Sequence, residues 1–287
     1  MKIKFWGTRG SIAVPGKDTI RYGGNTPCIQ LTSNSGETLI LDAGTGIKTL
    51  GDNLIKLDST NLNLLITHSH WDHIQGLPFF KPFYSEQYEV NIYASANNGL
   101  DVNEIISRQL VSAFFPVTEK IFKSKINIKK ISSGDNFKLG DFSISSIAAH
   151  HSKGTLSFKI EVDGKTIVYM TDNEIFYSYN VLPEINSITE KNKGLIDFVK
   201  DCDYLVHDCM YDVKSYKNKI GWGHSNNFSA AMFAISANVK NLVMFHYNPD
   251  YIDSELDKII NDTNALLVSQ NSDIKCIPAM EDKIIEL

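Results

Sequence analysis

The segment Thr67–His73, with the sequence THSHWDH, constrains the fold of this chain more than any other feature. It follows the apolar run LNLLI, which predicts a buried strand. On that strand His68 and His70 would share a face, because side chains alternate with a period of two. A helical turn beyond them would bring Asp72 and His73 to the same pocket. Burying four such groups together is costly unless their lone pairs are satisfied, and a divalent metal ion satisfies them.

The same pattern recurs along the chain, because several other apolar runs end in a side chain that can bind a metal or transfer a proton. Predicted strands end at His151, Asp172, His207 and His246. All of the eight histidines except His150 lie at such strand ends or in loops. Any one of them would more often be a structural residue, but together they indicate one shared site at an edge of the sheets.

Asp42 also ends a predicted strand, Thr38–Leu41, and begins the glycine-rich turn DAGTG. We expect this carboxylate to orient a metal-binding histidine through a hydrogen bond. A plain strand-to-helix turn is the alternative interpretation. The glycines of this turn are interpreted as turn residues in preference to a phosphate cradle.

Composition and charge exclude several broad classes of protein. The formal net charge of −5 argues against broad electrostatic binding to nucleic acid or to anionic membranes, although it permits a local basic patch. No apolar run approaches the ~18 residues of a membrane helix, and we expect no signal peptide. The four cysteines form no CxxC pair and are expected to be reduced. Without repeats or linkers, a single domain over residues 1–287 in the cytoplasm is expected.

Taken together, these histidines and aspartates resemble the HxHxDH…H…D…H ligand set of the metallo-β-lactamase fold. This resemblance covers essentially the whole chain. It implies an α/β (α+β) fold, a four-layer αββα sandwich in which two sheets lie face to face and the metals lie at one edge. The substrate is not fixed by the fold.

The resemblance also implies two divalent metal ions and names their ligands. The ligands would be His68, His70 and His151 for the first ion, Asp72, His73 and His246 for the second, and Asp172 as a bridge between them. Asp72 is also expected to be catalytic. His150 stays open as an alternative to His151, although the following residues fit the family spacing better with His151. Imidazole and carboxylate ligands favour Zn²⁺ first, then Mn²⁺ or Fe.

Two segments, His207–Asp208 and Gly223–Ser225, resemble loops of the tRNA 3′-processing endonucleases and the class II cyclic phosphodiesterases. By this resemblance Asp208 would orient His224, which would stabilise a phosphoryl oxygen or protonate the leaving alkoxide near neutral pH. The endonucleases carry glutamate where Asp208 stands, so the shorter side chain departs from their pattern. Alternatively, His224 only caps the helix that follows it. His207 is expected to lie behind the ligands.

The function predicted from these features is that of a dinuclear metal-dependent phosphodiesterase. A hydroxide bridging the metals would attack the phosphorus of a small phosphodiester, such as a cyclic nucleotide. The acidic charge and the lack of a glycine-rich arm argue against tRNA, so no large nucleic acid and no membrane partner are expected. A homodimer is expected. The alternatives are a thioester or lactam hydrolase of the same fold and a catalytically silent nucleotide-binding protein.

Four aromatic side chains are candidates for stacking on a nucleobase: Tyr22, Phe79, Phe80 and Trp222. For each of them, packing within the core or a loop is the alternative interpretation.

Overall fold

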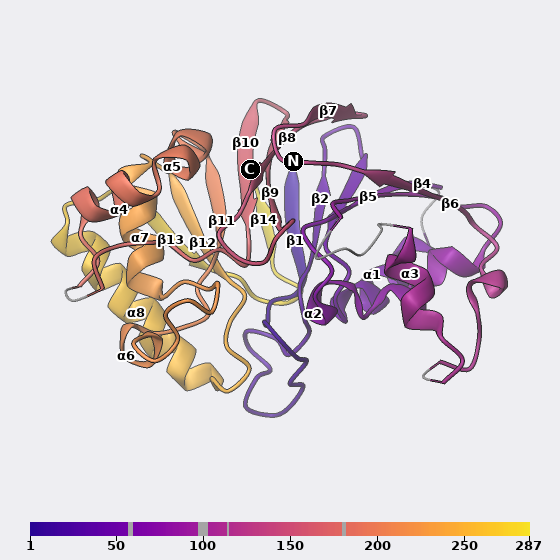
Figure 1. Cartoon of the computed structure of the whole chain (residues 1–287), viewed down its shortest axis with the longest axis horizontal. Coiled ribbons are helices and arrows are strands. Elements are labelled where there is room, and N and C mark those ends of the chain that lie inside the picture. Colours follow the sequence, from indigo (N-terminus) through magenta and orange to yellow (C-terminus); the bar gives the residue numbers. More distant parts are fainter. Residues whose placement is uncertain (57–59, 97–102, 114, 180–181) are drawn as a thin grey trace.

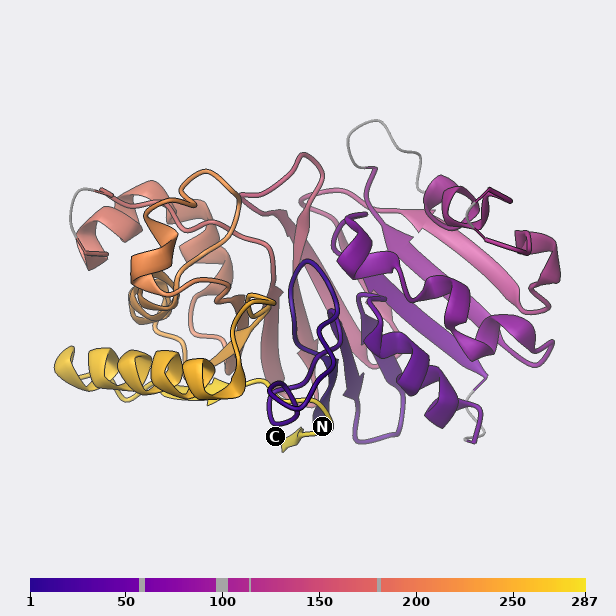
Figure 2. The ribbon, with the colours of Figure 1, turned by 90° about the horizontal axis from the view of Figure 1, so that it is seen from below.

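Two seven-stranded sheets lie face to face in the computed structural model, and helices cover their outer faces (Figures 1 and 2). The model describes residues 1–56, 60–96, 103–113, 115–179 and 182–287. The N-terminal half of the chain builds most of one sheet, and the C-terminal half builds most of the other, as the colours in Figure 1 show.

The first sheet combines antiparallel strands from the N-terminal hairpins with parallel strands connected by helices. Its strands, in spatial order, are β14 (Ile284–Glu286), β1 (Lys2–Gly7), β2 (Cys28–Thr32), β3 (Thr38–Leu41), β4 (Asn61–Ile66), β5 (Glu89–Ala94) and β6 (Lys125–Lys130). Strands β3 to β6 are parallel to one another, so their carboxyl ends meet at one edge.

The second sheet has the same mixed character, with β10 to β13 parallel and β7 to β10 antiparallel. Its strands, in spatial order, are β13 (Lys275–Pro278), β12 (Asn241–Phe245), β11 (Tyr204–Asp208), β10 (Lys165–Met170), β9 (Leu156–Val162), β8 (Phe142–Ala148) and β7 (Asn136–Leu139). Strand β8 runs in the same direction as β10, because each is antiparallel to β9.

Most helices lie on the outer faces of the sheets. The α-helices are α1 (Gly46–Leu54), α2 (Trp71–Ile74), α3 (Glu104–Ser107), α4 (Ile185–Lys191), α5 (Lys193–Val199), α6 (Val213–Tyr216), α7 (Asn227–Ser236) and α8 (Asp253–Ser269). The 3-10 turns are Leu77–Phe79, Lys81–Tyr84, Arg108–Leu110 and Glu119–Ile121. None of the described helices has both the length and the hydropathy of a membrane-spanning segment.

Apolar side chains form three layers of core that match this architecture. The middle layer lies between the sheets and joins Phe5 and Leu31 of the first sheet to Phe158 and Phe245 of the second. The outer layers lie under α1 and α3 on one side and under α4, α5, α7 and α8 on the other. Burial of both faces explains why β4 reads as a nearly continuous apolar run. The predicted αββα sandwich is therefore confirmed.

Two predicted elements differ from the observed ones. The alternation of apolar and polar residues predicts one strand over Phe137–Ala149, but a turn at Gly140, with φ +53°, divides it into β7 and β8. The sequence also predicts a helix from about Asp101 to Ser112, but the structure has the short α3 followed by a 3-10 turn. Its first two residues, 101 and 102, lie outside the described part of the chain.

Candidate metal centre

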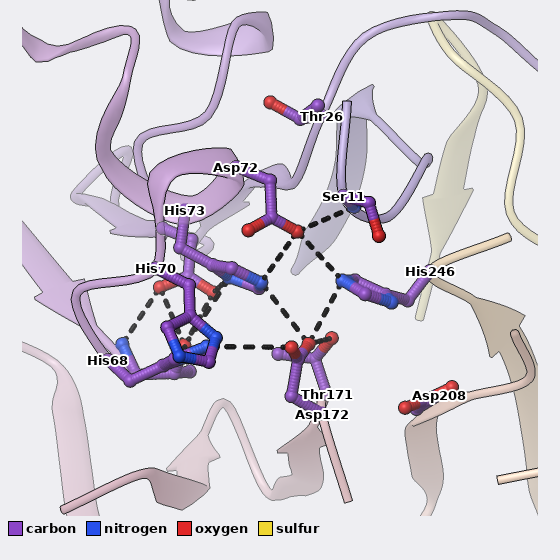
Figure 3. A network of polar contacts seen from close by, with 12 residues as sticks. Ser11, Thr26, His68, His70, Asp72, His73, Thr171, Asp172, Asp208 and His246 are labelled. Carbon is purple, nitrogen blue, oxygen red and sulfur yellow. Dashed lines mark hydrogen bonds and ion pairs between the residues drawn. The ribbon is translucent and has the colours of Figure 1, made fainter. Parts of the chain in front are cut away.

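The loops that follow β4, β8, β10 and β12 converge at the edge of the sandwich where these strands end. They bring together all seven residues predicted as metal ligands: His68, His70, Asp72, His73, His151, Asp172 and His246. Figure 3 shows several of these side chains pointing towards one another from both sheets. His151, and not His150, belongs to this cluster. The donor atoms form two four-residue groups, each within 4.8 Å, that share Asp172.

The first group surrounds one oxygen of the Asp172 carboxylate. Oδ2 of Asp172 lies 3.5 Å from Nε2 of His68 and 3.5 Å from Nε2 of His151. Nδ1 of His70 lies 3.1 Å from the same nitrogen of His151. Three imidazoles and a carboxylate are a donor set that suits a divalent ion such as Zn²⁺.

The second group surrounds the other oxygen of the same carboxylate. Oδ1 of Asp172 lies 3.2 Å from Nε2 of His73 and 3.0 Å from Nε2 of His246. Oδ2 of Asp72 lies 3.3 Å from the same nitrogen of His246 and accepts a hydrogen bond from the backbone N–H of Ser11 (Figure 3). Asp172 therefore faces both donor groups, one with each oxygen.

The chemistry of these donors fits metal ions. Among the described residues, Nε2 of His68 and Nε2 of His73 have no hydrogen-bond partner although both side chains are fully buried. Burial holds the pKa of His68 well below its usual range, so its ring is neutral and its lone pair is available. Burial opposes ionisation of Asp172, yet His246 and His73 hold its pKa well below the usual range. Buried nitrogen atoms without partners and a buried ionised carboxylate are the arrangement that bound cations would stabilise.

Asp42 makes the orienting contact expected of it. Its Oδ2 accepts hydrogen bonds from Nδ1 of His73 at 2.8 Å and from the Tyr169 hydroxyl at 2.7 Å, and its Oδ1 accepts one from the Thr67 backbone N–H. The contact to His73 fixes the proton on Nδ1 and leaves Nε2 to face Asp172. Tyr169 was not predicted, because a tyrosine within the apolar strand KTIVYM looks like any core aromatic residue.

His151 is oriented by a backbone carbonyl, since its Nδ1 lies 2.9 Å from the carbonyl oxygen of Gly223. His150, the alternative ligand, instead stacks on Phe176 with ring centroids 4.4 Å apart.

Gly10 was also missed by the sequence reasoning. It packs against the ring of His246 so closely that a Cβ on Gly10 would lie 2.4 Å from Cε1.

The backbone is strained at three of these positions. Asp42, Asp172 and His246 have φ values of 58°, 49° and 59°, a region that few residues other than glycine adopt. Asp42 and His246 directly follow the last residue of their strands, and Asp172 comes one residue later, so the strain turns the chain sharply and aims each side chain into the cluster. Strain of this kind concentrates at functional sites.

Asp208 and His224 form a hydrogen-bonded pair beside the cluster. Oδ2 of Asp208 lies 2.7 Å from Nδ1 of His224, whose ring stacks 5.3 Å from that of His246. Burial disfavours the charged imidazolium, but Asp208 outweighs burial and raises the pKa of His224. Helix α7 is capped by Asn226, so His224 is not its cap. His207 lies behind the pair, with Nδ1 2.7 Å from the carbonyl oxygen of Asp208.

Comparison with known proteins supports this description. A family model described as a beta-lactamase superfamily domain matches residues 38–247. Ribonuclease Z of Picrophilus torridus is 25% identical, with 92% of this chain and 91% of that protein covered. Two solved structures share the fold: the metallo-beta-lactamase fold protein YhfI of Bacillus subtilis (TM-score 0.70, 15% identity) and human tRNase Z, short form (TM-score 0.66, 17% identity). Each covers 100% of this chain and 99% of its own.

These matches confirm the predicted resemblance and correct one expectation. The prediction that no large nucleic acid is involved is wrong, because the matched proteins include a ribonuclease Z and a tRNase Z. The prediction relied on a net charge of −5 averaged over the whole chain, and an average does not describe the charge of one binding face. The matches do not address the expected homodimer.

Proposed function

Because this chain belongs to the beta-lactamase superfamily domain family, we propose that it hydrolyses phosphodiesters at a site that holds two divalent metal ions. Family membership and the ribonuclease Z relatives confirm the broader prediction of a metal-dependent hydrolase. The observation that carries the proposal is the Asp208–His224 pair beside the cluster, because an alkoxide leaves a phosphodiester poorly without a proton.

We propose one metal ion for each of the two donor groups. One ion would be held by His68, His70, His151 and Asp172, and the other by Asp72, His73, His246 and Asp172. Bound ions would supply Lewis acidity towards the phosphoryl oxygens and lower the pKa of an attacking water. The donor set favours Zn²⁺, with Mn²⁺ or Fe as alternatives.

The side chains of this chain would perform the remaining tasks. Asp208 orients the His224 ring through Nδ1 and stabilises its protonated form, so Nε2 of His224 can donate a proton to the leaving oxygen. Asp42 and the carbonyl of Gly223 accept hydrogen bonds from Nδ1 of His73 and of His151, so Nε2 of each ring is directed towards the metal centre.

Two kinds of phosphodiester are candidates for the substrate. A cyclic nucleotide is the small substrate that the sequence pattern suggests. An RNA with a 3′ extension is suggested by the names of the ribonuclease Z and tRNase Z relatives. Both present the same reacting group, so the chemistry at the metal centre does not separate them.

Protein loaded with Zn²⁺ or Mn²⁺ should hydrolyse bis-(p-nitrophenyl) phosphate, and His70→Ala or Asp172→Ala should abolish turnover. Parallel assays with cyclic mononucleotides, cyclic dinucleotides and a 3′-extended tRNA precursor would identify the substrate. Full activity of either variant, or of protein freed of metal by chelation, would contradict the mechanism. Faster turnover of thioesters or lactams than of every phosphodiester would favour the acyl hydrolase instead.

A further inference from the structure

A cavity of about 640 Å³ opens directly beside the metal centre. Two of the predicted metal ligands, His70 and His151, line it, and so do His150, Phe176 and Trp222. Its volume lies within the range of about 300–1,000 Å³ that is usual for small-molecule sites. A ligand in this cavity would therefore lie next to two predicted metal ligands and to aromatic side chains.

One aromatic side chain that lines the cavity is Trp222, which is exposed but held in place by the backbone contacts of its two neighbours. Trp222 is 59% exposed, a large fraction for a tryptophan. Both glycines that flank it have positive φ, and their N–H groups donate to Glu174: Gly221 to Oε1 at 2.7 Å and Gly223 to Oε2 at 2.8 Å. Glu174 is buried and also accepts from the Tyr216 hydroxyl.

The second aromatic side chain that lines the cavity, Phe176, is connected to the same glutamate. Phe176 lines the cavity and stacks on His150 at an interplanar angle of 18°. Nδ1 of His150 lies 3.3 Å from the carbonyl oxygen of Glu174. Glu174 therefore helps to hold both aromatic side chains of the cavity in place. The hydrogen bond that it accepts from the Gly223 N–H also positions the Gly223 carbonyl, which orients His151. A preorganised pair of aromatic surfaces lowers the entropic cost of binding a flat ligand.

One lysine, Lys153, lines this cavity, and a second lysine lies against the ring of Trp222. Nζ of Lys219 lies 3.9 Å from the centroid of the tryptophan ring, but Lys219 lines a neighbouring cavity and not this one. Of the other aromatic candidates, Tyr22 and Phe80 are buried in the core and are not available for stacking. Phe79 is exposed but packs on Phe115 and does not line this cavity.

We propose that the cavity lined by Trp222 and Phe176 binds the nucleobase of the substrate while its phosphodiester lies at the metal centre. The inference rests on the proposed function and narrows it to diesters that carry a nucleoside. Stacking recognises the flat face common to all bases, so this subsite would accept a base from a cyclic nucleotide or from RNA.

The test compares two substrates that differ only in the base: thymidine 5′-(p-nitrophenyl phosphate) and the same compound with 1,2-dideoxyribose in place of thymidine. Release of p-nitrophenolate gives kcat/KM for both. Wild-type protein should prefer the thymidine compound, and Trp222→Ala should lower kcat/KM for that compound about 5- to 100-fold while leaving the abasic compound unaffected. Trp222→Phe should retain most of the preference.

A binding measurement makes the test independent of turnover. In equilibrium dialysis with thymidine 5′-monophosphate, Trp222→Ala and Phe176→Ala should each raise Kd several-fold, whereas the matched control Phe79→Ala should leave it unchanged. Because Trp222 is exposed, its truncation should leave the melting temperature unchanged.

The outcomes separate the two claims. If both compounds are hydrolysed at equal rates and Trp222→Ala binds the monophosphate with the wild-type Kd, the proposed base subsite is wrong. The proposed phosphodiesterase activity would not be affected by that result. Binding of the monophosphate that depends on Trp222, without hydrolysis of either compound by metal-loaded protein, would support the subsite and overturn the proposed function.

Discussion

Replacing Asp42 by asparagine should weaken metal binding by disturbing the tautomer of His73. Oδ2 of Asp42 now accepts a hydrogen bond from Nδ1 of His73 at 2.8 Å, which leaves Nε2 free to face the cluster. If the new amide nitrogen faced His73, it would donate to Nδ1 and move the ring proton to Nε2, where a metal would bind. If it faced Thr67 instead, it would oppose the backbone N–H that now donates to Oδ1 at 2.8 Å. Neither orientation satisfies both neighbours.

The expected magnitude follows from the contacts that are lost. Loss of a partner that orients a metal ligand typically costs 10- to 100-fold in affinity, so metal affinity should fall by about that factor. In metal-free protein, the fully buried Asp42 accepts from Thr67, His73 and Tyr169. Loss of one charge-assisted bond among these should lower the free energy of unfolding by about 2 kcal/mol.

Two measurements check these values: competition for Zn²⁺ against a chromogenic chelator, and urea unfolding of the metal-free protein. Asp52→Asn is a matched control, because Asp52 lies on α1 and pairs only with Lys48 and Lys81 among the described residues. Its metal affinity should equal that of wild type. Wild-type affinity in Asp42→Asn as well would refute the argument that this carboxylate sets the tautomer of His73.

Two further variants probe the opposite side of the site. Gly10→Ala should displace the His246 ring, because the added Cβ would lie 2.4 Å from Cε1. The purified variant should therefore bind less zinc per chain than the wild type. Full zinc stoichiometry would show that the loop of residue 10 moves and the ring does not. Asp208→Asn should move the alkaline limb of the kcat/KM profile to lower pH, because the carboxylate raises the pKa of His224 and its loss lets burial depress that pKa. An alkaline limb that stays in place would exclude His224 as the acid.

Most strands could be predicted from sequence because each is a short apolar run with clear ends. The sequence predicts strands over Thr38–Leu41 and Asn241–Phe245, the bounds observed, since both are largely buried apolar runs that a polar residue follows directly. The residues of the cluster were also predictable, because parallel strands carry them to one edge. Gly10, Tyr169 and Glu174 were not, because their roles depend on contacts with residues far away in the chain.

The cavity lined by Trp222 and Phe176 is a second feature that could not be predicted from the sequence alone. Trp222 was one of four aromatic candidates in the sequence, and nothing in their local patterns distinguished an exposed ring from a buried one. Burial removes Tyr22 and Phe80, and the Glu174 contacts explain how an exposed tryptophan can be held in one position. The pair of glycines in GWG permits positive φ on both sides, but glycines also follow Tyr22, so the glycines alone do not single out Trp222.

Metal binding should also hold the two sheets together, because neither sheet contains a complete donor set. The loop after β4 in the first sheet supplies His68 and His73, whereas Asp172 and His246 follow strands of the second. Without metal, that edge holds unpaired buried nitrogen atoms. Zinc at 100 times its Kd should therefore stabilise the fold by about 2.7 kcal/mol. Hydrogen exchange should slow most at the carboxyl ends of β4 and β10, on both sides of the same edge. Uniform slowing over the whole chain, or protection of one sheet alone, would show that metal binding does not couple the sheets at this edge.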